Sequence, residues 1–239
     1  MSVTVEAPAK LTLSLRITGV RSDGYHLIDA EMVSLDVGDR LVIDPDGDGL
    51  VVVRDGVVSP GGTDDLVARA LQLVGRTAGI ELHKHVAAGA GLGGGSSDAA
   101  AVLRWAGMVD PLRAVELGAD VGFCLIGGRA RVRGIGEVVE PLPFEERTFT
   151  LLTPPLHCST PLVYATWDRL GGPVGDHGND LEPAALELVG ELARWRDELW
   201  EATGARPRLA GSGSTWFVEG AHPGPGRVVA HTVPAHRGA

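Results

Sequence analysis

The chain has 239 residues, of which 44% are hydrophobic and 22% charged, as is ordinary for a folded protein of one large or two small domains. Its net charge of -10 argues against nucleic-acid binding, which needs a basic face. No apolar run approaches the roughly 20 residues of a membrane span, residues 1–10 do not resemble a signal peptide, and the two cysteines form no motif. We therefore expect a cytoplasmic protein that binds neither membranes nor nucleic acid. We also expect it to be a monomer or weak homodimer.

The first part of the chain is predicted to be rich in strands. Apolar runs separated by Gly, Asp and Pro predict strands at 3–6, 11–17, 31–35, 40–43, 50–54 and 80–86. Apolar residues at helical spacing predict a helix over 64–75, with Asp64 or Asp65 as its N-cap. Further helices are predicted at 96–106 and 111–117, and further strands at 121–126, 130–133 and 137–141.

A second part is predicted to begin at residue 148, which gives two domains, 1–147 and 148–239. Its predicted elements are a strand at 149–152, a helix at 161–170, one long amphipathic helix at 183–203, and strands at 208–210, 215–218 and 227–232. Residues 220–227 are rich in Gly and Pro, which argues against a helix there.

The most informative segment is residues 89–98, Gly-Ala-Gly-Leu-Gly-Gly-Gly-Ser-Ser-Asp, which follow an apolar run and open an alanine-rich helix. Glycine allows the backbone to adopt positive φ and to approach a ligand closely. A helix N-terminus supplies unpaired N–H groups and partial positive charge. Together these features predict an anion site suited to phosphates.

Two common nucleotide motifs fit this segment poorly. Gly89, Gly91 and Gly94 satisfy the G-x-G-x-x-G pattern of dinucleotide-binding folds. However, the segment follows several predicted strands, and no suitably placed acidic residue lies about 20 positions further on. The Walker A pattern fails because no Gly-Lys-Ser or Gly-Lys-Thr follows. A different kind of glycine-loop nucleotide site remains.

Lysine and tyrosine are rare in this chain. Lys10 and Lys84 are the only lysines among the 21 basic residues, and Tyr25 and Tyr164 are the only tyrosines. A chain that uses Arg as its general cation is expected to keep Lys where a compact ammonium is needed. Lys10 is therefore a candidate catalytic cation. Lys84 is expected either near the nucleotide or at a solvated strand end.

Residues 91–100, Gly-Leu-Gly-Gly-Gly-Ser-Ser-Asp-Ala-Ala, resemble the second motif of the GHMP kinases. Segments 7–11, 21–26, 118–121, 134–137, 179–183 and 209–215 resemble, in order, further motifs of the members that phosphorylate a cytidine diphosphate ester in the non-mevalonate isoprenoid pathway. The resemblance implies a two-domain α+β fold. It would comprise a ribosomal-protein-S5-like ATP-binding domain at 1–147 and a shortened ferredoxin-like substrate-binding domain at 148–239.

The resemblance also implies roles for individual residues. Asp120 is expected to accept the proton of the attacking hydroxyl, and Lys10 to orient that hydroxyl and offset charge on the transferred phosphoryl group. Ser96 or Ser97 is a candidate ligand of Mg²⁺ bound with ATP, and one of them could be a helix N-cap. The ATP phosphates are expected to contact Ala87, Ala88, Gly89, Ala90, Gly91, Leu92, Gly93, Gly94, Gly95, Ser96 and Ser97. The substrate is expected to contact Thr12, Tyr25, His26, Tyr164, Gly211, Ser212 and Gly213, with the two tyrosines enclosing the base.

The sequence departs from the family pattern at a few positions. Thr12 stands where Asn is usual, and Ala87 and Gly122 replace prolines. Two alternatives stay open. One is another GHMP kinase such as a homoserine kinase, and the other is a non-catalytic nucleotide-binding protein of the same fold, which Thr12 and the shortened segments keep possible. Tyr25 and His26 argue against the first alternative, because a small amino alcohol needs no aromatic enclosure.

Overall fold

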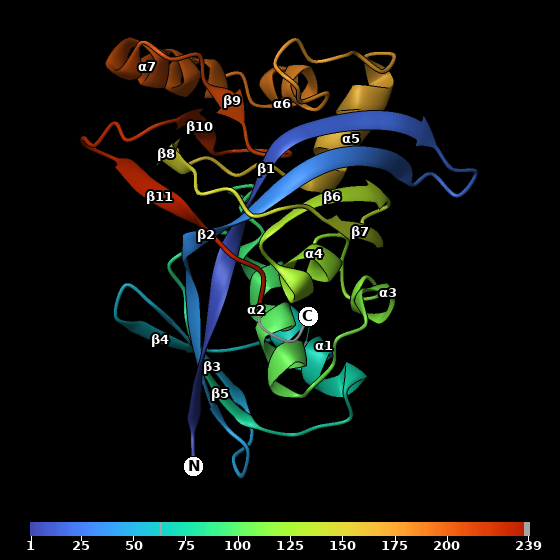
Figure 1. Cartoon of the computed structure of the whole chain (residues 1–239), viewed down its shortest axis with the longest axis vertical. Helices are drawn as coiled ribbons and strands as arrows, with labels where there is room; N and C mark the ends of the chain where they lie inside the picture. Colours follow the sequence, from blue (N-terminus) through green and yellow to red (C-terminus); the bar gives the residue numbers. More distant parts are fainter. Residues whose placement is uncertain (63, 237–239) are drawn as a thin grey trace.

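Two long antiparallel strands organise the structure, a computed structural model that describes residues 1–62 and 64–236. β1 (Val3–Val20) and β2 (His26–Asp44) pair along almost their whole length, and Figure 1 shows them passing through both halves of the molecule. The prediction of four shorter strands in this region was wrong. Register shifts interrupt the apolar alternation without ending the strands, at Pro8/Lys10, Thr12/Ser14 and Ile17/Gly19.

The remaining strands extend this pair into a mixed sheet. Its spatial order is β4-β3-β5-β2-β11-β8-β10-β9, with β1 and β6 also on β2, and β7 on β6. Because β11 pairs with both β2 and β8, it connects the strands of the two predicted parts. β4 was not predicted. The strand bounds are β3 Leu50–Arg54, β4 Val57–Pro60, β5 Gly79–His83, β6 Arg129–Gly134, β7 Val138–Pro141, β8 Thr148–Leu152, β9 Arg208–Leu209, β10 Trp216–Glu219 and β11 Arg227–Val233.

The helices form two groups. Figure 1 shows α1 to α4 together beside one half of the long strands, and α5 to α7 at the end of the molecule farthest from the N-terminus. Asp65 is the N-cap of α1, as predicted, because its side chain accepts from the N–H of Val67 at 2.8 Å. The helix bounds are α1 Leu66–Leu73, α2 Gly94–Trp105, α3 Pro111–Ala114, α4 Val121–Ile126, α5 Thr160–Arg169, α6 Glu182–Leu188 and α7 Leu192–Thr203.

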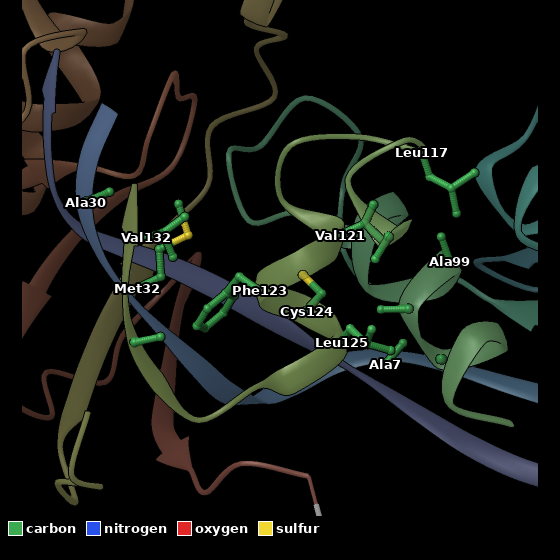
Figure 2. Close-up of a cluster of buried hydrophobic side chains, with 14 of the residues drawn as sticks. Ala7, Ala30, Met32, Ala99, Leu117, Val121, Phe123, Cys124, Leu125 and Val132 are labelled. Atoms are coloured by element: carbon green, nitrogen blue, oxygen red, sulfur yellow. The ribbon is translucent and has the colours of Figure 1, made fainter. Parts of the chain in front are cut away.

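Two further predicted elements differ in the structure. Residues 121–126 form helix α4 rather than a strand. Nearly all of them are buried, so the sequence has no spacing of apolar and polar residues that would distinguish a helix from a strand. Figure 2 shows Phe123 of α4 near Met32 of β2, within the core that α4 shares with the strands and α2. The long helix predicted at 183–203 is broken into α6 and α7, because Val189 leaves the helical conformation next to Gly190.

The segment between β10 and β11, residues 220–226, contains no helix, as its Gly and Pro content predicted. Within the described ranges, none of the helices is long and apolar enough to span a membrane.

Candidate active site

The glycine loop, residues 87–97, leaves β5 and enters α2 in conformations that favour glycine. Gly89, Gly91 and Gly93 have φ of 71°, 77° and 66°. A Cβ atom on Gly91 would lie 2.2 Å from the carbonyl oxygen of Ala210, and one on Gly93 would lie 2.6 Å from Cγ of Lys10. The absence of side chains therefore lets the loop backbone lie directly against two neighbouring segments.

The second glycine turn, residues 210–215, lies in the C-terminal part of the chain and is hydrogen-bonded to this loop. The backbone N–H groups of Ser214 and Thr215 donate to the carbonyl oxygens of Gly89 and Ala90, at 3.1 and 3.0 Å. The two glycine segments thus form one wall, although they lie far apart in the sequence.

Asn179 supports the second glycine turn. Its Nδ2 atom donates to the carbonyl oxygens of Leu209 and Gly211, at 2.9 and 2.7 Å. Its Oδ1 atom accepts from the N–H of Leu181 at 3.0 Å. The motif at residues 179–183 therefore positions backbone that borders the site, rather than supplying a reacting group.

We expect Gly91→Ala to lower the free energy of unfolding by about 1–3 kcal/mol, because the new Cβ meets backbone at a positive φ. We also expect the KM for ATP to rise about tenfold or more as the loop moves away from the second glycine turn. Urea unfolding and steady-state kinetics measure both effects. Gly190→Ala is the control, because Gly190 has room for a Cβ and lies between α6 and α7. If the two variants have the same free energy of unfolding and the same KM for ATP, the close contact of Gly91 with the second glycine turn does not matter for stability or for ATP binding.

Lys10 and Asp120 meet next to the glycine loop. Nζ of Lys10 lies 3.2 Å from Oδ2 of Asp120 and donates to Oγ1 of Thr12 at 3.0 Å. The Lys10 side chain is only 6% exposed, whereas that of Asp120 is 31% exposed. The register shift beside Lys10 changes the direction of its side chain relative to the regular strand. The buried ammonium attracts the carboxylate, which remains accessible to a ligand.

A cavity of about 430 Å³ lies along the glycine loop. Its lining includes loop residues 87–96 together with Asp98, Asp120 and Thr160. Ser96 borders this cavity, whereas Ser97 is 1% exposed and its hydroxyl donates to the carbonyl of Pro8 at 2.6 Å. Neither serine is the N-cap of α2, since Gly93 occupies that position. Of the two candidate metal ligands, only Ser96 faces space that a nucleotide could occupy.

A second cavity, of about 730 Å³, is lined by Tyr25, His26 and Tyr164. Thr160 lines both cavities, so they are adjacent. The ring centroids of His26 and Tyr164 are 4.7 Å apart, whereas Tyr25 is 60% exposed at the rim. Burial raises the pKa of the Tyr164 hydroxyl, and the charge of Asp120 adds to this effect. Tyr164 therefore presents a neutral aromatic surface close to the Lys10 and Asp120 pair.

Known proteins are similar to this chain in both sequence and fold. The model of the family described as "GHMP kinases N terminal domain" matches residues 65–129. The 4-diphosphocytidyl-2-C-methyl-D-erythritol kinase of Paracoccus denitrificans (strain Pd 1222) is 40% identical over 233 residues, which cover 88% of this chain and 84% of that protein. This chain belongs to the 4-diphosphocytidyl-2-C-methyl-D-erythritol kinase family, within the GHMP kinases.

A further family member and two solved structures are also similar to this chain. The kinase of the same name from Acidovorax sp. (strain JS42) is 35% identical and covers 97% of this chain and 90% of its own length. A crystal structure of 4-(cytidine 5'-diphospho)-2C-methyl-D-erythritol kinase has a TM-score of 0.76 and 32% identity, covering 96% of this chain and 99% of that one. Homoserine kinase from Cytophaga hutchinsonii, with a TM-score of 0.55 and 18% identity, shares the fold alone. The predicted α+β GHMP kinase fold is confirmed.

A buried ionic cluster, which consists of Asp39, Lys84 and Asp98, was not predicted from the sequence. Nζ of Lys84 binds Asp39 and lies 2.6 Å from Oδ2 of Asp98. Asp39 also accepts from the N–H groups of His85 and Val86, at 2.5 and 2.8 Å. The cluster therefore joins the strand end that enters the glycine loop to the helix that leaves it. The rarity of lysine was the one sequence signal that singled out Lys84.

Two residues of α5 were also missed, Thr160, which lines both cavities, and Asp168, which lines the aromatic cavity. Oγ1 of Thr160 lies 2.7 Å from Oγ of Ser212, which connects α5 to the second glycine turn. Asp168, also on α5, lies 2.8 Å from Nε2 of His26. Hydroxyl and carboxylate groups on helices are common, so no sequence pattern distinguished these two.

Proposed function

We propose that this protein transfers the γ-phosphate of ATP to the 2-hydroxyl of 4-diphosphocytidyl-2-C-methyl-D-erythritol, in the non-mevalonate isoprenoid pathway. The observation that supports this best is the position of the Lys10 and Asp120 pair. Asp120 lines the cavity along the glycine loop, and its charge acts on Tyr164 in the adjacent aromatic cavity. The pair thus lies where a nucleotide in one cavity and a cytidine ester in the other would meet.

Asp120 is the proposed proton acceptor for the attacking hydroxyl. A carboxylate is a weak base for an alcohol, so the proton moves late, in a loose transition state dominated by positioning and electrostatics. Lys10 lies 3.2 Å from Asp120 and would orient the hydroxyl while offsetting charge on the transferred group. Thr12, which accepts a hydrogen bond from Lys10, would hold the ammonium in place and border the substrate.

The glycine loop is the proposed ATP phosphate site. Its backbone N–H groups, from Ala87 to Ser97, and the N-terminus of α2 would bind the phosphates. The Ser96 hydroxyl at the cavity fits Mg²⁺, which takes few protein ligands and completes its octahedron with phosphate and water. Mg²⁺ would neutralise charge on the β- and γ-phosphates.

The aromatic cavity is the proposed site of the cytidine base. Tyr25 and Tyr164 offer flat surfaces for stacking, and His26 offers a hydrogen-bonding edge. Gly211, Ser212 and Gly213 of the second glycine turn would border both substrates. With this assignment, residues 1–147 contribute the ATP site, and residues 148–239 complete the substrate site.

The two alternative functions have less support. Relatives at 35–40% identity carry the name of the cytidine-ester kinase, whereas the homoserine kinase structure is only 18% identical. A non-catalytic role would not require the contact between Lys10 and Asp120.

We expect Tyr25→Ala to raise the KM for the cytidine ester about tenfold or more while leaving the KM for ATP nearly unchanged. Stacking on an aromatic ring contributes about 1–3 kcal/mol per base. Tyr25 is 60% exposed, so the substitution should cost little stability. Steady-state kinetics with each substrate varied in turn measure this. A similar loss for both substrates would contradict the base-site assignment.

The test of the proposed function is ADP release by the purified protein with ATP and Mg²⁺. The cytidine ester, homoserine and mevalonate are compared as acceptors. We expect turnover with the cytidine ester alone. Turnover with homoserine would identify a different kinase, and ATP binding without turnover of any acceptor would identify a binding protein.

A further inference from the structure

We propose that Asp168 is a positioning residue that fixes the tautomer of His26, so that the site selects cytosine over uracil. The carboxylate would keep the proton on Nε2 and leave Nδ1 as a hydrogen-bond acceptor for the exocyclic amino group of cytosine. This inference rests on the proposed function, because it concerns the base of the same substrate.

The contact between His26 and Asp168 is direct. Nε2 of His26 lies 2.8 Å from Oδ1 of Asp168, although the residues are 142 positions apart in the sequence. The His26 side chain is 9% exposed and that of Asp168 is 51% exposed. Asp168 follows Tyr164 by four residues on α5, which places both side chains on one face of the helix. Both residues line the aromatic cavity with His26.

Aromatic neighbours restrict the orientation of the His26 ring. The Tyr164 ring lies at 4.7 Å from it with an interplanar angle of 36°, and the Trp167 ring lies edge-on at 5.5 Å and 84°. Trp167 is itself fixed, because its Nε1–H donates to the carbonyl of Pro173 at 2.9 Å. The imidazole is therefore held with Nε2 toward Asp168 instead of rotating freely.

The chemistry of the two groups determines the tautomer. An ionised carboxylate only accepts hydrogen bonds, so the ring nitrogen that it contacts must carry the proton. In a neutral imidazole the other nitrogen, Nδ1, is then an acceptor. In the part of the chain that the structure describes, the hydrogen bond of the His26 ring is that of Nε2 with Asp168, and His26 lines the aromatic cavity, so the proposal assigns Nδ1 to the ligand.

An acceptor at Nδ1 distinguishes the two pyrimidines. Cytosine carries an amino donor at the position where uracil carries a carbonyl acceptor. Cytosine would complete a hydrogen bond with Nδ1, whereas uracil would bring two acceptors together. Sites built to pair with a substrate hydrogen-bonding group discriminate strongly against an analogue that lacks it.

The test is calorimetric binding of CDP and UDP to the whole protein and to Asp168→Asn, with Glu187→Gln as the control. Glu187, on α6, forms an exposed ion pair with Arg169, the neighbour of Asp168 on α5, so its loss removes a carboxylate close to Asp168 without touching His26. An Asn side chain can turn its amide donor toward Nε2 and thereby admit the opposite tautomer. We expect wild type and Glu187→Gln to bind CDP at least about tenfold more tightly than UDP, and the preference to fall about tenfold in Asp168→Asn.

A spectroscopic measurement reads the tautomer directly. We expect ¹⁵N–¹H correlation spectra of the histidine side chains to show the Nε2–H form of His26 in the wild-type protein and a mixture in Asp168→Asn. An Nδ1–H form in the wild type, or an unchanged CDP preference in Asp168→Asn, would overturn the proposal. Neither readout needs turnover, so failure of the proposed kinase reaction is recognised separately, by absent ADP release from a protein that still prefers CDP.

Discussion

Asp120→Asn is expected to lower kcat by about 10²–10⁴-fold, with little change in the affinity for ATP. The amide keeps the shape of the carboxylate but cannot accept the hydroxyl proton. It also removes the negative charge that lies 3.2 Å from Nζ of Lys10. Asp120 precedes α4 as its N-cap residue, its side chain is 31% exposed and it makes no capping hydrogen bond, so helix α4 should tolerate the change.

Single-turnover phosphoryl transfer and nucleotide binding, measured on the same preparation, separate the chemical step from binding. Asp197→Asn is the control, because Asp197 is exposed on α7 and, within the described residues, forms its ion pair with the neighbouring Arg196. An unchanged rate in Asp120→Asn would remove this residue from the mechanism. A loss of ATP binding equal to the loss of rate would assign it to nucleotide binding instead.

Lys84→Met is expected to lower the free energy of unfolding by about 3–5 kcal/mol, because it leaves buried carboxylates without their cation. Asp39 is fully buried, and the Asp98 side chain is 3% exposed. Burial raises the pKa of Asp98 to about 7, and Lys84 opposes that rise. Urea unfolding at constant pH measures the loss. The KM for ATP should rise as well, because the cluster joins the two ends of the glycine loop.

A double variant tests whether the loss comes from unpaired charge. Lys84→Met combined with Asp98→Asn should be more stable than Lys84→Met alone, since the second change removes one buried carboxylate. If the two changes destabilise additively, the ionic cluster does not act as a unit.

Much of the fold could be predicted from local sequence patterns, and the errors in the predicted helices and strands have physical causes. The Asp65 cap and most strands were predictable because their signals lie within a few residues. Helix α4 was mistaken for a strand because it is buried almost throughout. The long strands appeared divided because bulges reset the alternation of side chains.

The candidate site was predictable only where a motif marked it. Lys10 and Asp120 came from ordered motifs, and the structure brings them together. The choice between Ser96 and Ser97 required the structure, because adjacent residues of a helix face different surroundings. Asp168 belongs to no motif and reaches His26 only through the placement of α5 beside the start of β2.

The ³¹P NMR spectrum of the product shows which hydroxyl of the cytidine ester receives the phosphate. In 4-diphosphocytidyl-2-C-methyl-D-erythritol, carbon 2 bears the methyl group and the hydroxyl and therefore no hydrogen. We expect ATP, Mg²⁺ and the cytidine ester to give a new monoester resonance without coupling to a carbon-bound proton. A monoester resonance split by one or two such protons would place the phosphate on another hydroxyl, and the absence of any new monoester would rule out the proposed kinase reaction.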